Sequence, residues 1–448
     1  MIDIITIETP TLGDRSYVAH DGEVAVVIDP QRDLDRVTAV LDGAGVRVTH
    51  IFETHIHNDY VTGGYALAER TGAAYHVNAA DPVSFERVGV SDGDVIGVSP
   101  RMKVRVLSTP GHTFTHLSYV LMVDDADYAV FTGGSLLYGS TGRPDLLGPD
   151  HRHALAHHQY ASAHKLAAQV DDAAQVWPTH GFGSFCSSTQ ADGSSSTIGK
   201  ERRTNPVLTE EENAWIEQML AGLDAWPAYY AHMAPANSGG PSDPDLSLPE
   251  VADKEVIRQR LRDGEWVVDL RNRVAFAAGH VPGSYSIGLD GQFATYLGWL
   301  IPWGTPLTLL GESAEQVAEA QRELVRIGID ELAGHATGSP EDWSDEWATL
   351  QRATFADLAH VRHHRPVTIL DTRRNQEHHD AHIAGALHIP LHELLERIDE
   401  VPTSEVWVHC AAGYRAAFAS SILQRAGHPV VHVDDSFENA AKAGLPMA

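Results

Sequence analysis

The sequence has few cysteines and no long hydrophobic run. Two cysteines in 448 residues exclude a disulfide framework, and a reducing, cytoplasmic location is the simplest expectation. No apolar run approaches the roughly 18 residues that suggest a membrane-spanning helix. The N-terminal residues lack the basic segment that is typical of a signal peptide. We therefore expect a protein without a membrane partner.

Basic residues are also scarce, because 32 lysines and arginines face 61 acidic residues and give a formal net charge of −29. This charge argues against nucleic acid and anionic membranes as partners. Hydrophobic residues make up 43% of the chain, which is enough for sizeable cores. At roughly 150 residues per domain, the length suggests about three domains. Homo-oligomer formation stays open.

Histidine is frequent, and the most informative pair lies in residues 54–60 (THIHNDY), directly after an apolar run predicted to be a strand. Alternate residues of an extended segment point the same way, so His55, His57 and Asp59 can converge on one point. Imidazoles together with a carboxylate bind divalent metals. A solvated polar loop is the alternative, because a chain with 27 histidines can contain such a pair by chance.

Two later stretches favour the metal interpretation. Residues 108–113 (STPGHT) and 176–181 (VWPTHG) each follow or end an apolar run, and each places a histidine, His112 or His180, beside a glycine. Glycine lets the backbone approach a ligand closely. Three predicted strand ends therefore deliver histidine to loops, which indicates a metal site.

Together these three motifs resemble those of the metallo-β-lactamase-fold hydrolases over roughly residues 1–230. The resemblance implies an αββα sandwich with one divalent metal. Residues 131–134 (FTGG) and 142–146 (GRPDL) are similar to the persulfide dioxygenase branch of that superfamily. Its members oxidise glutathione persulfide with molecular oxygen at a mononuclear iron held by two histidines and one carboxylate.

The sequence departs from this family at two positions. Gly134 stands where the resemblance implies the aspartate ligand, and Tyr60 stands where it implies a further histidine. The metal ligands that remain are His55, His57 and His112, with Asp59 and His180 nearby. Three histidines with an open position suit zinc, whereas iron(II) would need a carboxylate such as Asp59. Both metals stay open.

Three further residues are candidates for a substrate or thiol site, namely Tyr60, Arg143 and Cys186. Arg143 could bind a substrate carboxylate or form a structural ion pair with Asp145. Cys186 follows His180 by six residues and is either a small buried residue or a thiol that carries or senses persulfide.

The composition of residues 233–249, which are rich in proline, serine and glycine, predicts a linker after a first domain of residues 1–232. Beyond it the chain repeats itself. Asp269 and Asp371 each end a predicted strand, and each is followed eleven residues later by a histidine and three residues after that by a glycine. This pattern, with further strands and helices, predicts doubly wound parallel α/β domains and resembles the rhodanese domain twice. The copies are residues 250–338, the first repeat, and 350–448, the second repeat.

The second repeat contains a cysteine in a chemically favourable place. Residues 405–409 predict a strand, Cys410 follows it, and a helix is predicted from residue 416. Backbone N–H groups and the helix dipole favour the thiolate, which is the nucleophilic form. Residues 410–415, here called the sulfur loop, can form an anion nest from Ala411, Ala412, Gly413 and Tyr414, with Arg415 adding positive charge. This loop resembles that of rhodaneses, which implies that Cys410 carries sulfur.

The first repeat has no cysteine in the matching segment, so we expect it to be catalytically silent. The whole chain is then a sulfur-metabolism enzyme. A persulfide dioxygenase-like metal domain precedes a thiosulfate or persulfide sulfurtransferase, with persulfide, thiosulfate, sulfite and a low-molecular-weight thiol as small-molecule partners. A zinc-dependent, glyoxalase II-like thioester hydrolase stays open for the metal domain. So does a non-catalytic persulfide sensor or docking module.

Overall fold

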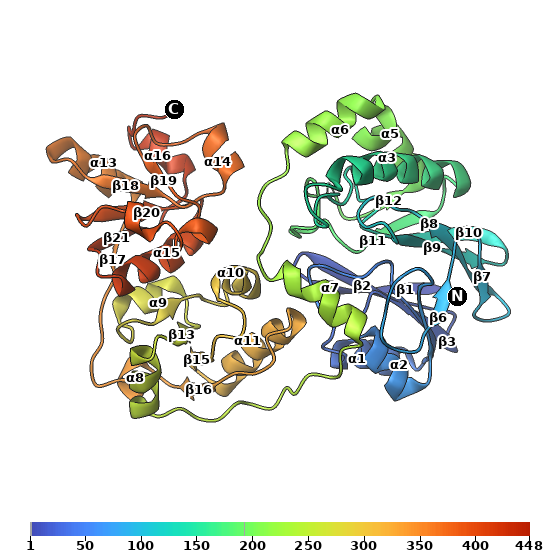
Figure 1. The fold of residues 1–448 in the computed structure, drawn as a ribbon, viewed down its shortest axis with the longest axis horizontal. Coiled ribbons are helices and arrows are strands. Elements are labelled where there is room, and N and C mark those ends of the chain that lie inside the picture. The colour runs from blue at the N-terminus through green and yellow to red at the C-terminus, as the bar shows by residue number, and fades with distance from the viewer. Residues whose placement is uncertain (1, 192) are drawn as a thin grey trace. The chain divides into compact units, whose positions relative to one another are not determined.

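The computed structural model describes residues 2–191 and 193–448 (Figure 1). Contacts divide the chain into two compact units. The first ends at Asp245 and takes in Val325–Gly328, and the second comprises Leu246–Leu324 and Ile329–Ala448. No helix in residues 2–191 or 193–448 combines the length and the apolar character needed to cross a bilayer.

The first unit contains two six-stranded sheets. In spatial order, the first sheet consists of β1 (Asp3–Thr9), β2 (Asp14–His20), β3 (Val24–Ile28), β4 (Arg47–Phe52), β5 (Ala74–Asn78) and β6 (Val88–Val90). The second consists of β12 (Ser196–Thr197), β11 (Gln175–Pro178), β10 (Ala126–Gly133), β9 (Leu117–Val123), β8 (Met102–Ser108) and β7 (Val95–Gly97).

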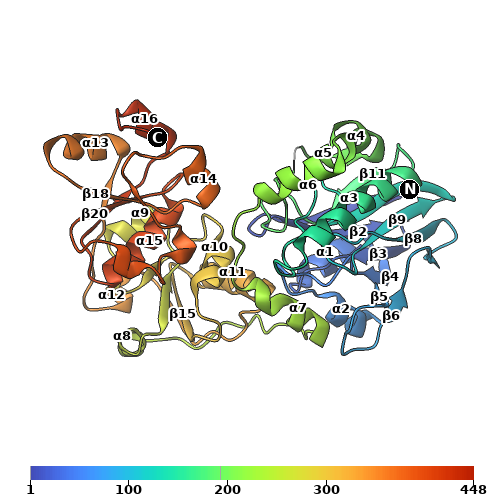
Figure 2. The same ribbon diagram turned by 45° about the horizontal axis from the view of Figure 1, so that its top comes forward.

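The two sheets pack face to face, and helices cover their outer faces (Figures 1 and 2). Strand side chains alternate between faces, so Phe131 on β10 enters the core between the sheets while Val130 packs towards the helices. Helices α1 (Asp35–Ala44) and α2 (Gly64–Thr71) cover the first sheet. The second sheet is covered by α3 (Arg152–Gln169), α4 (Ile198–Thr204), α5 (Pro206–Thr209) and α6 (Glu212–Ala221). This is the αββα sandwich that the resemblance implies.

The segment predicted to be a linker begins differently in the structure. Helix α7 (Tyr230–Gly239) occupies its first part, so the prediction of a linker from residue 233 is wrong there. The proline, serine and glycine content suggested a flexible chain, but Met233 and Asn237 are buried and fix the helix. Helix α7 belongs to the first unit, which runs on to Asp245.

The second unit contains two parallel sheets. The first has the order β14 (Tyr285–Ser286), β13 (Trp266–Asp269), β15 (Leu307–Gly311) and β16 (Gly334–Thr337). The second has the order β17 (Gln351–Ala353), β21 (Val430–Val433), β20 (Val406–His409), β18 (Thr368–Asp371) and β19 (Leu387–His388). Read from the opposite edge, β19-β18-β20-β21 repeats the order β14-β13-β15-β16.

Helices surround both sheets. They are α8 (Lys254–Arg262), α9 (Arg273–Ala278), α10 (Phe293–Leu300), α11 (Ala314–Arg326), α12 (Pro340–Trp343), α13 (Phe355–His364), α14 (Asn375–Asp380), α15 (Tyr414–Arg425) and α16 (Glu438–Lys442). Two 3₁₀ turns cover Leu391–Glu393 and Ile398–Glu400.

The motif found twice in the sequence forms the same contacts twice. In each copy the strand ends in a buried aspartate that pairs with the arginine two residues later, at 2.6 Å for both Asp269–Arg271 and Asp371–Arg373. Each arginine also donates to the carbonyl oxygen eight residues further on, at 2.7 and 2.8 Å. The spacing in the sequence therefore records a real structural repeat.

Candidate functional site

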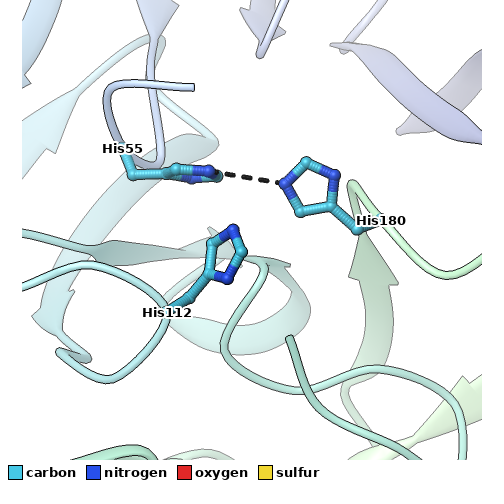
Figure 3. Close-up of side chains that lie close together, drawn as sticks. All are labelled: His55, His112 and His180. Carbon is cyan, nitrogen blue, oxygen red and sulfur yellow. Dashed lines mark hydrogen bonds between the residues drawn. The ribbon is translucent and has the colours of Figure 1, made fainter. Parts of the chain in front are cut away.

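Three histidines from three different loops meet in the first unit (Figure 3). His55 follows β4, His112 follows β8 and His180 follows β11, and all three are buried. We call them the histidine cluster. One ligand nitrogen from each lies within 4.8 Å of the others, and the Nε2 atoms of His55 and His180 are 3.4 Å apart.

Each histidine of the cluster is held through its Nδ1 atom. His112 Nδ1 lies 2.8 Å from the Arg143 carbonyl oxygen, which can only accept, so Nδ1 carries the proton. Thr54 uses its hydroxyl proton on Asp29, so His55 Nδ1 donates to Thr54 Oγ1 at 2.9 Å. His180 Nδ1 donates to Asp14 at 2.9 Å. This anchoring leaves the Nε2 atoms facing the centre, as in sites where an outer group orients a metal-bound histidine.

His57 lies outside the compact group of three histidines. It was predicted to join His55 and His112, but the compact three-histidine set contains His180 instead. Its Nε2 lies 3.3 Å from carboxylate oxygens of both Asp29 and Glu53. Although burial opposes the charge, Asp29 and Glu53 raise the pKa of His57 to about 10. His57 also belongs to a second potential ligand group, with Asp59 and His180.

The residues at the centre fit a divalent cation. His112 Nε2, His57 Nδ1 and both carboxylate oxygens of Asp59 are buried without a hydrogen-bond partner, which is costly for polar atoms unless a ligand satisfies them. Asp59 and Asp14 raise the pKa of His180 to about 9, against the effect of burial. Burial and the Asp59 charge raise the pKa of Asp14 to about 7. The same negative potential would favour a bound dication.

Asp29 positions the loops around the cluster and was not among the predicted site residues. Its carboxylate accepts from the Thr54 backbone N–H, the Thr54 hydroxyl and the Thr179 hydroxyl. It therefore ties together the loops of His55 and His180. Its φ of 49° lies in the left-handed region, which aspartate tolerates better than most residues. Asp29 directly follows an apolar strand, as the loops of the histidine cluster do, and this position in the sequence could have marked it as a site residue.

Asn237 on α7 is a second residue that sequence analysis missed. Its amide Nδ2 donates to the carbonyl oxygens of His57 and Tyr60, both at 2.9 Å, and its oxygen accepts from Thr62 N–H at 2.8 Å. Helix α7, which lies in a segment that composition assigned to a linker, therefore fixes the loop of residues 57–62.

The glycine at position 134 is explained by the position of His112. A Cβ added at Gly134 would lie 2.6 Å from His112 Cγ, far inside van der Waals contact. The aspartate that the resemblance implies therefore cannot stand here while His112 keeps its place.

The three candidates for a substrate or thiol site are all engaged in the protein interior. Arg143 pairs with Asp145 through two nitrogens, at 2.7 and 2.8 Å, so the ion-pair alternative is the correct one. Tyr60 is buried and its hydroxyl contacts His57 Nε2 at 3.0 Å. Cys186 is 0% exposed, and burial followed by the Asp59 charge raises the pKa of its thiol well above the usual range. Of the two alternatives for Cys186, these observations favour the small buried residue.

The sulfur loop lies between a strand and a helix, as the sequence predicts. Cys410 follows β20 and is 2% exposed, and the Gly413 N–H donates to its sulfur at 3.2 Å. Gly413 has a φ of 90° and precedes the twelve-residue helix α15. Ala412 is exposed, whereas Ala411, Tyr414 and Arg415 are half-buried. The loop therefore presents backbone to the sulfur at a helix N-terminus.

Arg415 is not a free cation. Glu377 on α14 binds its guanidinium through two oxygens, at 2.5 and 2.7 Å. Burial opposes the charge of Glu377, but Arg415 outweighs it and lowers the pKa of this carboxyl to about 2. An anion that enters the loop therefore meets an arginine already paired with a carboxylate.

Comparisons with known proteins find a domain family for the C-terminal part of the chain and relatives of the metal-domain part. A rhodanese-like domain model matches residues 354–443. The hydroxyacylglutathione hydrolase of Rhodopseudomonas palustris is 35% identical over 30% of this chain, and the match spans only about half, 52%, of that relative. Human mitochondrial persulfide dioxygenase ETHE1 is 28% identical over 45% of this chain and 71% of its own length.

A crystal structure of a metallo-beta-lactamase from Staphylococcus aureus subsp. aureus COL aligns with a TM-score of 0.66 and 27% identity. It covers 75% of this chain and 98% of that one. The chain thus contains a metallo-β-lactamase-fold region similar to hydroxyacylglutathione hydrolases and persulfide dioxygenase, followed by a C-terminal rhodanese-like domain.

Proposed function

We propose that this chain is a sulfur-metabolism enzyme. Its first unit is a persulfide dioxygenase-like metal domain and its second repeat is a thiosulfate or persulfide sulfurtransferase. The observation that carries the proposal is a cysteine held at a helix N-terminus by Gly413 N–H, on the same chain as a buried histidine cluster. The first repeat is a rhodanese-like domain without its cysteine.

Sulfur transfer at Cys410 follows from the loop. The Cys410 thiolate attacks the outer sulfur of a thiosulfate or of a persulfide, and the bond between the two donor sulfurs breaks. The outer sulfur stays on Cys410 as a persulfide, and sulfite or a thiolate leaves with the electron pair. Reversal with another acceptor completes the cycle. The Gly413 N–H and the N-terminus of α15 stabilise negative charge on the sulfur in both states.

In the metal domain, His55, His112 and His180 would hold one divalent ion, with Asp59 as the nearest carboxylate donor. Iron(II) would supply access to molecular oxygen, and zinc would supply Lewis acidity. The protein's own part is to orient the imidazoles through Thr54, Arg143 and Asp14. Although burial opposes the charge, His180 and His57 lower the pKa of Asp59 and keep it ionised. With oxygen as the oxidant, a persulfide and water would yield a thiol and sulfite.

The proposal is tested by two assays on the full chain. Cys410→Ser should abolish thiosulfate:cyanide sulfur transfer, and unchanged transfer would reject Cys410 as the nucleophile. Iron-loaded protein given glutathione persulfide should consume oxygen, and His112→Ala should not. Absent uptake together with intact sulfur transfer would reject the dioxygenase and leave a hydrolase or a non-catalytic sensor for the first unit.

A zinc-dependent thioester hydrolase is the second candidate for the first unit. It is favoured by three converging imidazoles without a carboxylate at position 134, and by relatives named hydroxyacylglutathione hydrolase. Zinc-loaded protein that hydrolyses a glutathione thioester, with no oxygen uptake by the iron form, would decide for it.

A further inference from the structure

The helix that starts at the sulfur loop packs on the first repeat. Along α15, Phe418 makes edge contacts with the rings of Trp266 and Tyr285, and Ser421 Oγ accepts from the Ser286 N–H at 3.0 Å. Gln424 Oε1 lies 2.9 Å from His280 Nε2. The silent repeat is therefore a direct support of α15.

The sulfur loop itself is held from the first repeat at two points. The Tyr414 hydroxyl donates to the Gly288 carbonyl oxygen at 2.7 Å, and its ring lies so close to Gly291 that an added Cβ there would be 2.6 Å from Cζ. Beneath the loop, Arg273 Nε of α9 pairs with Asp434 at 2.6 Å. Asp434 is also bound by Arg352 of the second repeat, at 2.5 Å.

Arg273 lies very near the sulfur-binding turn. A Cβ at Gly413 would clash with Asp434 Oδ1 and lie 3.0 Å from Arg273 Nε, so this ion pair fits against the glycine. Gly413 is also the residue whose N–H donates to Cys410 Sγ at 3.2 Å. The Arg273 guanidinium therefore packs against the residue whose N–H donates to the Cys410 sulfur.

We infer that Arg273, from the repeat without a cysteine, is a positioning residue for sulfur transfer at Cys410. It fixes Asp434 and, through it, the Gly413 turn that donates to the Cys410 sulfur. This inference rests on the proposed sulfurtransferase function. The silent repeat then completes the site and is not a spacer.

The test is the time profile of Cys410 alkylation by iodoacetamide at one fixed pH in the full chain, followed by the mass of the peptide that contains it. Arg273→Gln should lower both the alkylation rate and the sulfur-transfer rate about three- to tenfold. Arg273→Lys keeps the cation and should stay nearer to the unaltered protein. Arg425→Gln is the matched control, because Arg425 also joins the repeats, through the Gly283 carbonyl oxygen at 2.6 Å.

Alkylation and sulfur-transfer rates of Arg273→Gln that match the unaltered protein, or equal losses in Arg273→Gln and Arg425→Gln, would overturn the inference. If Arg273→Gln does not fold, Tyr414→Phe decides, since it removes only the hydroxyl bound to Gly288. If Tyr414→Phe lowers the sulfur-transfer rate severalfold, the first repeat positions the sulfur loop. An unchanged rate overturns that role. An unaltered protein that transfers no sulfur would instead reject the proposed function, while the alkylation profile still judges Arg273.

Discussion

The two repeats of the second unit share their strand order and their buried Asp–Arg pairs. They differ at one loop, which follows β15 in the first repeat and β20 in the second. Sheet register aligns Leu310 with Asp269 and His409 with Asp371, so Gly311 stands where Cys410 stands. Three residues separate Leu310 from α11, whereas four separate His409 from α15. The two repeats share a scaffold and differ in the loop on which the proposed sulfur transfer depends.

The difference extends beyond the cysteine. Glu377, which pairs with Arg415, lies six residues after Asp371, and Ala275 lies six residues after Asp269. A Cβ added at Gly311 would lie 3.1 Å from Gln316 Oε1 and Val317 Cγ2, so a side chain there is crowded. The first repeat therefore lacks the cysteine and the carboxylate partner, and a side chain at position 311 would require Gln316 and Val317 to shift.

The largest expected effect is the loss of sulfur transfer when the cysteine is moved from the second repeat to the first. Cys410→Ser should lower sulfur transfer below detection, and adding Gly311→Cys should not restore it, because the shorter loop offers no equivalent of Gly413. Thiosulfate:cyanide transfer measures both. Activity recovered by Gly311→Cys would mean that the scaffold alone suffices.

The shared Asp–Arg pairs predict equal losses of stability. Asp269→Asn and Asp371→Asn each leave a buried arginine without its charge partner, at a cost of about 3–5 kcal/mol in the free energy of unfolding. Urea unfolding followed by tryptophan fluorescence would measure it. A loss confined to one variant would show that the two repeats are not equivalent scaffolds.

Metal binding should raise the stability of the first unit and leave that of both repeats unchanged. Within residues 2–191 and 193–448, the potential ligand clusters all lie in the first unit. A metal at a hundredfold excess over its Kd should add about 2.7 kcal/mol to the stability of that unit. Calorimetry with and without metal would show one transition that moves, and the shift should vanish in His112→Ala. Sulfur transfer should be the same in both samples, and a metal-dependent transfer rate would contradict the separation.

The smallest expected effect concerns the pair that only the second repeat has. The pKa of Glu377 is about 2 in the folded protein, below its ordinary value of 4.5. Its contribution to stability is therefore present above about pH 4.5 and is lost as the pH falls towards 2. The stability difference between the unaltered protein and Glu377→Gln should shrink from about pH 6 to about pH 3. A constant difference in urea unfolding would contradict the ion pair.

Much of this architecture could be predicted from the sequence, because alternating strands and short motifs are local signals. The strand predicted at residues 405–409 is β20, and the repeat spacing marked the aspartates of both Asp–Arg pairs. Contacts between distant residues could not be predicted. Composition concealed α7 and Asn237, and no local pattern shows that Asp14 holds His180 or that Arg273 lies beneath the sulfur loop.

Gly134 also limits how the metal site can change. Since a Cβ at this position collides with the His112 ring, a carboxylate at 134 and the present place of His112 exclude each other. Gly142 adds to this, because a Cβ there would lie 2.8 Å from His112 Nδ1. A side chain at either position therefore requires the His112 ring to move. Substitutions at positions 112, 134 and 142 should consequently have non-additive effects, because each changes the space that the others need.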